Sequence, residues 1–171
     1  MKNYPLFLLF ALLAMAGCAP QYAPLATVEK VDLQRYAGTW YEIARYEHYF
    51  EKGCSEVSAT YTLTDEGKVE VINRCTDEEG RHKEAKGIAY AVDESNSRLK
   101  VSFFRPFYGD YWILLLDEEY RYVLVGDPSR EYLWILSRTP QLDEAIVQSI
   151  LQKLPSLGYT AEPLIWTKQG E

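Results

Sequence analysis

The sequence predicts an all-β domain, an eight-stranded antiparallel up-and-down barrel with one C-terminal helix packed on its outside. Its length of 171 residues and its 47% hydrophobic content are typical of a single domain with its own core. Fourteen Tyr and four Trp favour strands, because flat rings pack well on a pleated surface. Short β-rich runs with turn signals between them recur over residues 39–138, as in a sandwich or barrel.

The strands are eight in number. They are predicted over residues 39–46, 56–64, 68–75, 85–92, 98–104, 110–116, 121–126 and 132–138. Long or irregular connections at 47–55, 76–84 and 105–109 alternate with tight ones at 65–67 and 117–120. Since every second connection of a meander lies at the same end, we expect one open end and one closed end. A barrel of eight strands can enclose one small ligand if its own side chains do not fill it.

One helix is predicted after the last strand, over Gln141 to Leu154, because apolar residues recur there at helical spacing. The apolar stripe should pack on the barrel wall and comprises Leu142, Ile146, Ile150, Leu151 and Leu154. Pro155 and Gly158 end the helix, and Leu164-Ile165-Trp166 forms a last apolar run.

The N-terminus has the features of a targeting segment. Lys2 precedes an apolar stretch too short to span a bilayer, and Met15-Ala16-Gly17-Cys18 resembles the bacterial lipobox, after which the Cys is lipidated. We therefore expect a lipoprotein signal peptide at 1–17, a lipidated N-terminus and tether at 18–30, and the folded domain at 31–171. Ala19 is not the Asp of inner-membrane retention, so the resemblance implies the outer membrane, with the barrel facing the periplasm. An ordinary signal peptide is the alternative.

Two cysteines remain when Cys18 is set aside. Cys54 and Cys75 are an even pair in an oxidising compartment, so a disulfide is predicted between them, with two buried free thiols as the alternative. A tight turn at 65–67 pairs Thr64 with Lys68 and therefore Val57 with Cys75. Cys54 is then out of register, and a bulge or a rim loop must bring it within reach of Cys75.

Composition and motifs argue against several other classes. A formal net charge of −7 disfavours a nucleic-acid partner. Neither metal-binding motifs nor catalytic motifs occur, so we expect no enzyme, no cofactor and no metal site. Glu42 is the one candidate buried carboxylate, and we expect it to hydrogen-bond the barrel wall or a ligand.

Residues at both ends of the predicted barrel carry a family resemblance. Gly38-Thr39-Trp40 opens the first strand and Arg138 follows the last, and together they resemble the lipocalin signature. In that family the Arg lies over the Trp ring and closes the barrel, so the resemblance implies that Gly38, Trp40 and Arg138 do so here. The family's T-D-Y motif is only echoed, by Asp117 and Tyr120.

Longer stretches, such as Gly38 to Arg45, Val101 to Gly109 and Tyr132 to Pro140, look like the bacterial Blc-type lipocalins, close to the apolipoprotein D branch. This resemblance implies fatty acids or lysophospholipids as ligands and allows a homodimer. Two other functions stay open. One is a lipocalin for another apolar molecule, such as a haem or a pigment, or with isomerase-like chemistry. The other is a ligand-free structural envelope lipoprotein.

Strand alternation, set in register by the resemblance, predicts which side chains line the interior. The expected ligand-binding residues are Glu42, Ala59, Tyr61, Val71, Asn73, Ala89, Val101, Phe103, Tyr111, Ile113, Trp134 and Leu136. The same alternation also places Ala44 and Leu115 inside. The segments His48 to Lys52 and Phe104 to Tyr108 should lie at the open rim, where they contact a headgroup, the membrane or another subunit, or form ordinary solvated loops.

Overall fold

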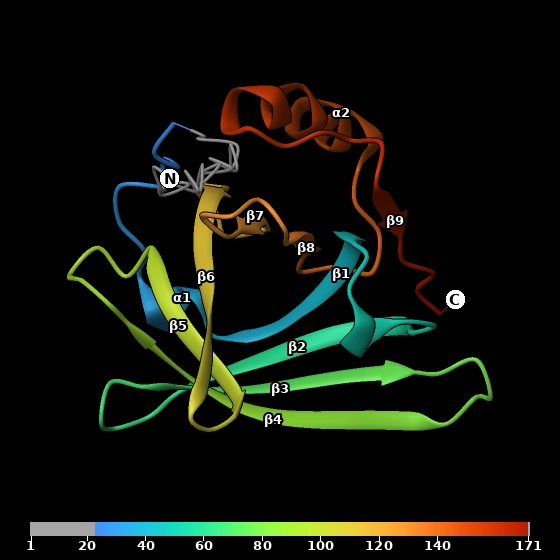
Figure 1. The fold of residues 1–171 in the computed structure, drawn as a ribbon, viewed down its shortest axis with the longest axis horizontal. Helices are drawn as coiled ribbons and strands as arrows, with labels where there is room; N and C mark the ends of the chain where they lie inside the picture. The colour runs from blue at the N-terminus through green and yellow to red at the C-terminus, as the bar shows by residue number, and fades with distance from the viewer. Residues whose placement is uncertain (1–22, 171) are drawn as a thin grey trace, which may run out of the picture.

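The structure is a computed structural model that describes residues 23–170, so the predicted signal peptide and Cys18 lie outside the described residues. Its elements follow the chain in a simple order (Figure 1). They are α1 (Leu33–Tyr36), β1 (Gly38–Tyr46), η1 (Tyr49–Glu51), β2 (Ser55–Leu63), β3 (Val69–Thr76), β4 (His82–Ala91), β5 (Arg98–Phe104), β6 (Phe107–Leu116), β7 (Tyr122–Gly126), β8 (Leu133–Ser137), α2 (Glu144–Lys153), η2 (Leu154–Leu157) and β9 (Leu164–Trp166).

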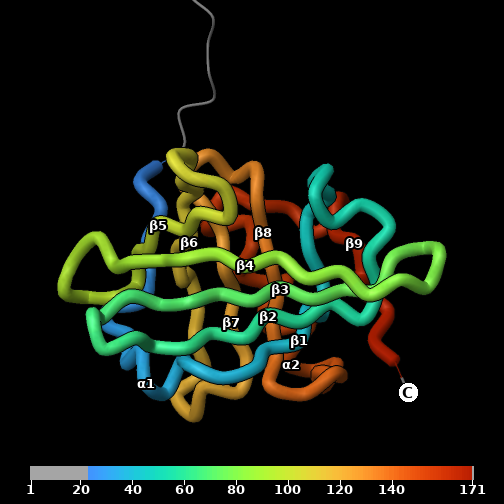
Figure 2. Tube along the Cα trace, turned by 90° about the horizontal axis from the view of Figure 1, so that it is seen from below, coloured from blue at the N-terminus to red at the C-terminus, as the bar shows by residue number. Residues whose placement is uncertain are grey.

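The sheet closes into the predicted antiparallel barrel. Each strand from β2 to β8 pairs with its neighbour in sequence, and β1 pairs with both β8 and β2. The last apolar run adds a ninth strand, because Ile165 of β9 pairs with Arg45 of β1 outside the ring of eight. The tube view in Figure 2 shows β2, β3 and β4 side by side across one face.

Two of the predicted long connections are shorter than expected. The prediction of a long or irregular loop at 105–109 is wrong, because Phe104 pairs with Phe107 and their rings stack with centroids 6.3 Å apart. This cross-strand pair extends the hairpin to a tight turn at Arg105-Pro106. The loop predicted at 76–84 shrinks in the same way, because β4 begins at His82, which pairs with Thr76.

β-Bulges change which face some residues occupy. Glu42 pairs with Leu136 but Ala44 pairs with Ile135, and a second shift lies between Ile113 and Leu115. An extra residue reverses the alternation beyond it. The predictions that Ala44 and Leu115 line the interior are therefore wrong. Both residues pack in the outer apolar cluster beneath the helix.

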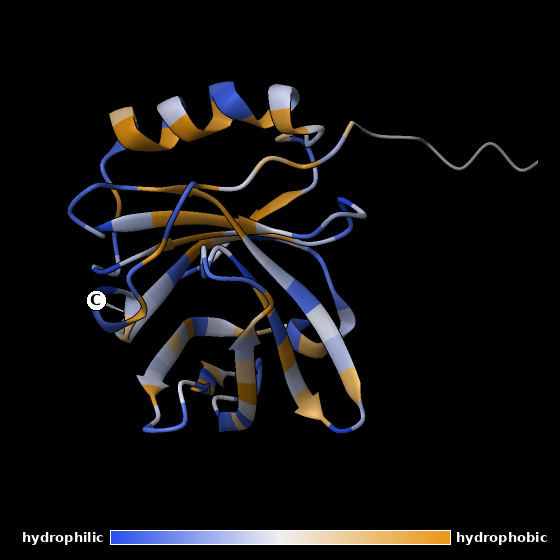
Figure 3. Cartoon of the chain, turned by 90° about the vertical axis from the view of Figure 1, so that its left-hand side faces the viewer, coloured by the Kyte–Doolittle hydropathy of each residue, from blue (hydrophilic) through white to orange (hydrophobic). Residues whose placement is uncertain are grey.

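The C-terminal helix α2 lies outside the barrel, on the side away from β2, β3 and β4 (Figure 1). It begins later than predicted, at Glu144, because the Asp143 side chain caps it by accepting a hydrogen bond from the Ala145 amide at 2.8 Å. Figure 3 shows its apolar face turned toward the strands. Ile150 and Leu154 of the predicted stripe are fully buried there, and Val147 joins them.

The described residues form two apolar cores separated by the barrel wall. The outer core lies between α2 and the outer faces of β1, β6, β7 and β8. The inner core includes Trp40, Ile113 and Val123 and fills the closed end. Within residues 23–170 no helix has both the length and the apolar character needed to cross a membrane.

Candidate ligand-binding cavity

A cavity of about 1000 Å³ lies inside the barrel, and residues of the inner core such as Tyr61 and Val71 form part of its wall. Apolar side chains from most strands border it, and small residues on β2 and β4, Ala59, Ala85 and Ala89, leave room in its wall. Rim residues from the β1–β2, β5–β6 and β7–β8 ends border its mouth, among them Tyr49, Phe104 and Tyr132. The barrel is thus closed at one end and hollow at the other, in a size range typical of small-molecule sites.

Nearly all the predicted lining residues border this cavity. They are Glu42, Ala59, Tyr61, Val71, Asn73, Ala89, Val101, Phe103, Tyr111, Trp134 and Leu136. Ile113 is the exception, because it lies nearer the closed end than Tyr111 and is fully buried in the inner core. The structure thereby gives these residues a common location, and their role in binding stays a prediction.

Three tyrosine hydroxyls meet at the inner end of the cavity. The Tyr111 hydroxyl lies 2.7 Å from that of Tyr36 and 2.9 Å from that of Tyr61, and all three residues border the cavity. We call these residues the tyrosine triad. Burial raises the pKa of all three phenols above the ordinary value, so they are neutral at physiological pH.

The closed end has the arrangement that the lipocalin signature implies. The Arg138 guanidinium carbon lies 3.9 Å from the centre of the Trp40 ring. Its Nη1 donates to the Thr39 carbonyl, and its Nη2 donates to the carbonyl groups of Arg35, Tyr36 and Ala37. The Arg138 guanidinium therefore stacks on the indole and also donates hydrogen bonds to main-chain carbonyl groups in and next to α1.

Two further residues complete this closure. Gly38 has a φ of +99°, and a Cβ there would lie 3.2 Å from Arg138 Nη1, so the position requires glycine. Tyr120, which stands where the family has the Tyr of its T-D-Y motif, accepts a hydrogen bond from Arg138 Nε through its carbonyl. Its hydroxyl accepts one from the Asp32 amide.

A buried polar cluster borders the cavity through Glu42 and Glu51. Arg45 Nη1 lies 3.0 Å from Glu42 Oε1, and Arg45 Nε lies 3.4 Å from Glu51 Oε2. His48 Nε2 approaches the same Glu51 oxygen at 3.1 Å. The Thr167 hydroxyl, beyond β9, donates to Glu42. Two carboxyl groups thus share one arginine in a site almost closed to solvent.

The two carboxyl groups of this cluster titrate in opposite directions. Burial, with repulsion from Glu51, raises the pKa of Glu42 to about 8. Burial also acts on Glu51, but the His48 hydrogen bond and charge outweigh it and lower the pKa of Glu51. Glu42 is therefore the group that holds a proton, and Glu51 is the anion that balances Arg45.

The rim combines these buried charges with exposed aromatic rings. In the segment His48 to Lys52, His48 and Glu51 are buried, while Tyr49 is 88% exposed. On the β5–β6 turn, Phe104 and Phe107 are 75% and 71% exposed. The rim residues predicted from sequence therefore divide into an inner polar set and an outer aromatic set.

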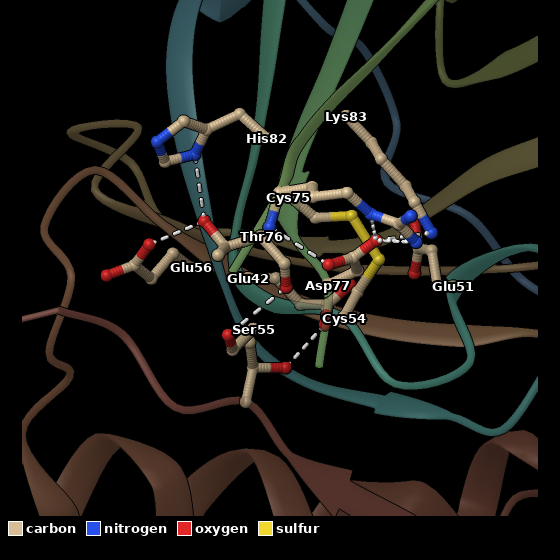
Figure 4. Close-up of a disulfide and its surroundings, with 12 residues drawn as sticks. Glu42, Glu51, Cys54, Ser55, Glu56, Cys75, Thr76, Asp77, His82 and Lys83 are labelled. Atoms are coloured by element: carbon tan, nitrogen blue, oxygen red, sulfur yellow. Dashed lines mark hydrogen bonds and ion pairs between the residues drawn. A yellow bond between two sulfur atoms is a disulfide. The ribbon is translucent and has the colours of Figure 1, made fainter. Parts of the chain in front are cut away.

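The predicted disulfide between Cys54 and Cys75 is present at the same rim (Figure 4). Ser55 pairs with Thr76 and Ser58 with Arg74, so Glu56 and Val57 together face Cys75 in a bulge. Glu56 has a φ of +51° there. The bulge brings the Cα atoms of the two cysteines to 5.6 Å, within the range that a disulfide requires, as the register argument demanded.

Sequence reasoning missed Tyr36 at the cavity and three residues that contact Glu42 behind it. Tyr36 lies on α1, which no periodic pattern marked, and the alternation that placed Ala44 inside assigned no inward position to Arg45. The bulge at Ile43 turns Arg45 onto the same face as Glu42. Thr167 and Gln169 lie far along the chain, and Gln169 bridges the carbonyl groups of Glu42 and Val57. No local signal in the sequence marked these contacts.

Comparison with known proteins identifies the class that this barrel and cavity represent. The model of the lipocalin-like domain matches residues 31–169, and the chain belongs to the lipocalin family. It is 44% identical over 159 residues to the outer membrane lipoprotein Blc of Citrobacter freundii, covering 91% of this chain and 90% of that protein. It is 40% identical over 167 residues to Blc of Vibrio cholerae, covering 96% and 98%. The Blc-type resemblance is thereby confirmed.

More distant relatives agree with this assignment. Apolipoprotein D of Mus musculus is 33% identical over 152 residues, covering 83% of this chain and 79% of that protein. Insecticyanin from the tobacco hornworm Manduca sexta superposes with a TM-score of 0.72 at 22% identity, covering 89% of this chain and 88% of that one, which shows the shared fold. Together with the cavity, the family supports the binding of a small hydrophobic ligand.

Proposed function

We propose that this protein binds, stores or carries membrane-derived lipids, namely fatty acids or lysophospholipids, with the acyl chain in the barrel cavity. The observation that supports this most directly is a volume of about 1000 Å³ bordered mainly by apolar side chains. Burial of an acyl chain there would supply most of the affinity, at about 0.8 kcal/mol for each CH₂ removed from water. The polar groups of the mouth would then contact the headgroup.

The location that we propose follows from the N-terminus and from the relatives. Lipidation of Cys18 would anchor the protein in the outer membrane, with the barrel facing the periplasm. The names of the Blc relatives describe outer membrane lipoproteins, which supports this location. An anchored carrier would exchange lipids at the surface of the membrane that holds it.

A matched pair of substitutions on β4 tests the lipid cavity. Ala85 borders the cavity, whereas its neighbour Lys86 points away and pairs with Glu84 on the surface. Ala85→Trp should fill the mouth and abolish the binding of a fluorescent fatty acid, while Lys86→Trp should leave it unchanged. Equal binding by both variants would mean that the probe does not enter the barrel, and the proposal would be wrong.

Native mass spectrometry of protein extracted from cells identifies the ligand class. Co-purified fatty acid or lysophospholipid would support the proposal. A bound chromophore would instead favour a lipocalin for a pigment or a haem, and a bare mass from gently extracted protein would favour a structural envelope lipoprotein.

A further inference from the structure

The tyrosine triad has one more hydroxyl proton than its own contacts consume. The three phenol groups carry three hydroxyl protons. The two hydrogen bonds that join their oxygens in a row take up two of these protons. Within the part of the chain that the structure describes, these three hydroxyls have no other hydrogen-bond partner. One O–H group therefore still needs an acceptor. Leaving it unpaired in a buried site would cost free energy.

The missing acceptor has to come from the cavity. Tyr36 and Tyr61 are almost completely buried, and all three residues of the triad border the cavity. Trp40 closes the barrel below them, and its Nε1 already donates a hydrogen bond to the Tyr36 carbonyl at 2.8 Å. The spare proton can thus reach an atom of a bound molecule, or a water that such a molecule displaces.

The charges around the triad favour a neutral acceptor over an ionised one. The Arg138 guanidinium lies beneath Tyr36 but is occupied by main-chain carbonyl groups and by the Trp40 ring. On the cavity side, Glu51 is anionic, and its charge contributes to the raised pKa of Tyr61. A second carboxylate placed here would be buried without a cation of its own, which is unfavourable.

We propose that the tyrosine triad is a binding subsite for a neutral oxygen, a hydroxyl or a ketone, at the inner end of an otherwise apolar ligand. This inference rests on the proposed function, because it assumes that a chain enters the barrel. It adds that the cavity accepts lipids oxygenated at the end remote from the headgroup. Such a ligand is held at two places, by its headgroup at the mouth and by its oxygen at the triad.

The test compares two acids that differ by one hydroxyl, hexadecanoic acid and ω-hydroxyhexadecanoic acid. Their dissociation constants are measured by displacement of a fluorescent fatty acid from the wild type and from the triple variant Tyr36→Phe, Tyr61→Phe, Tyr111→Phe. The control is a second triple variant, Tyr41→Phe, Tyr90→Phe, Tyr122→Phe, in which none of the three tyrosines borders the cavity.

In the wild type and the control, the ω-hydroxyl should weaken binding by no more than about threefold. In the triad variant it should weaken binding by about tenfold or more, because the buried hydroxyl has lost its partner. An equal penalty in all three proteins would overturn the subsite. Hexadecanedioic acid should bind the wild type more weakly than hexadecanoic acid, and tighter binding would overturn the preference for a neutral oxygen.

Two further results separate the subsite from the lipid cavity itself. If neither hexadecanoic acid nor a lysophospholipid binds any of the three proteins, the proposed function fails and the subsite fails with it. If the triad variant does not fold, a crystal structure of the wild type with ω-hydroxyhexadecanoic acid decides. The terminal oxygen should lie about 3 Å from a phenol oxygen of the triad, and a reversed chain, with that oxygen at the mouth, would contradict the proposal.

Discussion

Glu42 and Arg45 lie on the same inner face of β1 although they are three residues apart, and Arg45 Nη1 donates a buried hydrogen bond to Glu42 Oε1 at 3.0 Å. Regular alternation would place them on opposite faces. The bulge between Glu42 and Ala44 removes that conflict and turns Arg45 inward, where Glu51 also approaches it. One arginine then serves two carboxyl groups, so the cluster should respond to pH.

We predict that stability falls as pH rises from about 5 to 8. The pKa of Glu42 is raised to about 8 by burial, so in this window the folded state holds a proton that the unfolded state has released. Stability therefore decreases with pH, by at most about 1.4 kcal/mol per unit for one proton. Urea unfolding of the wild type and Glu42→Gln at several pH values checks this. The variant should lose the slope, and Glu70→Gln, on the exposed face of β3, should keep it.

Arg138 is expected to contribute strongly to stability because it stacks on Trp40 and binds several carbonyl groups. Arg138→Ala should lower the free energy of unfolding by about 2–4 kcal/mol. Arg138→Lys should be more stable than Arg138→Ala but less stable than the wild type, because an ammonium group cannot reproduce the several planar N–H donors of a guanidinium. Arg74→Ala, which breaks a half-exposed pair with Glu84, is the control and should cost far less. An equal loss of unfolding free energy in Arg138→Ala and Arg74→Ala would contradict the role of Arg138 in closing the barrel.

Loss of the disulfide should destabilise the barrel rim. Cys54 and Cys75 are 21 residues apart in sequence, and closing a loop of that size stabilises a fold by about 3 kcal/mol in the chain-entropy model. Chemical denaturation with and without reductant measures this contribution. The double variant Cys54→Ser, Cys75→Ser should resemble the reduced wild type and should be insensitive to reductant. A reductant effect that persists in the variant would assign the loss to another cause.

The exposed rim aromatics should assist lipid uptake. Truncating Phe107 and Tyr108 to Ala removes apolar surface at the cavity mouth, and uptake from vesicles should fall by roughly fivefold. The control is Val92→Ala, an exposed apolar residue in the β4–β5 connection that does not border the cavity. Unchanged uptake by the double variant would show that these rings are ordinary solvated surface.

Lipidation is predicted at Cys18. Cys18→Ser should abolish incorporation of labelled palmitate in cells and release the protein into the soluble periplasmic fraction. Cys54→Ser, Cys75→Ser should keep the label, since those thiols serve the disulfide. Label retained by Cys18→Ser would place the anchor elsewhere.

The sequence by itself determined the features that depend on local patterns and on composition. Period-two apolar runs and turn residues give eight strands in the right order. Trp40 lies in the first of them and Arg138 directly follows the eighth. An even pair of cysteines with a register mismatch led to both the disulfide and its bulge. Nearly all the predicted lining residues border the cavity, and they followed from alternation within a strand once the family resemblance had set the register.

Only the tertiary structure decided where that alternation breaks and which distant residues meet. A bulge depends on the partner strand as well as on its own sequence, so Ala44 and Leu115 moved outside while Arg45 moved in. The tyrosine triad joins α1, β2 and β6, and the Glu42 cluster needs Thr167 from beyond β9. Side chains so far apart in sequence become neighbours only when the barrel closes, because closure is a property of the whole sheet.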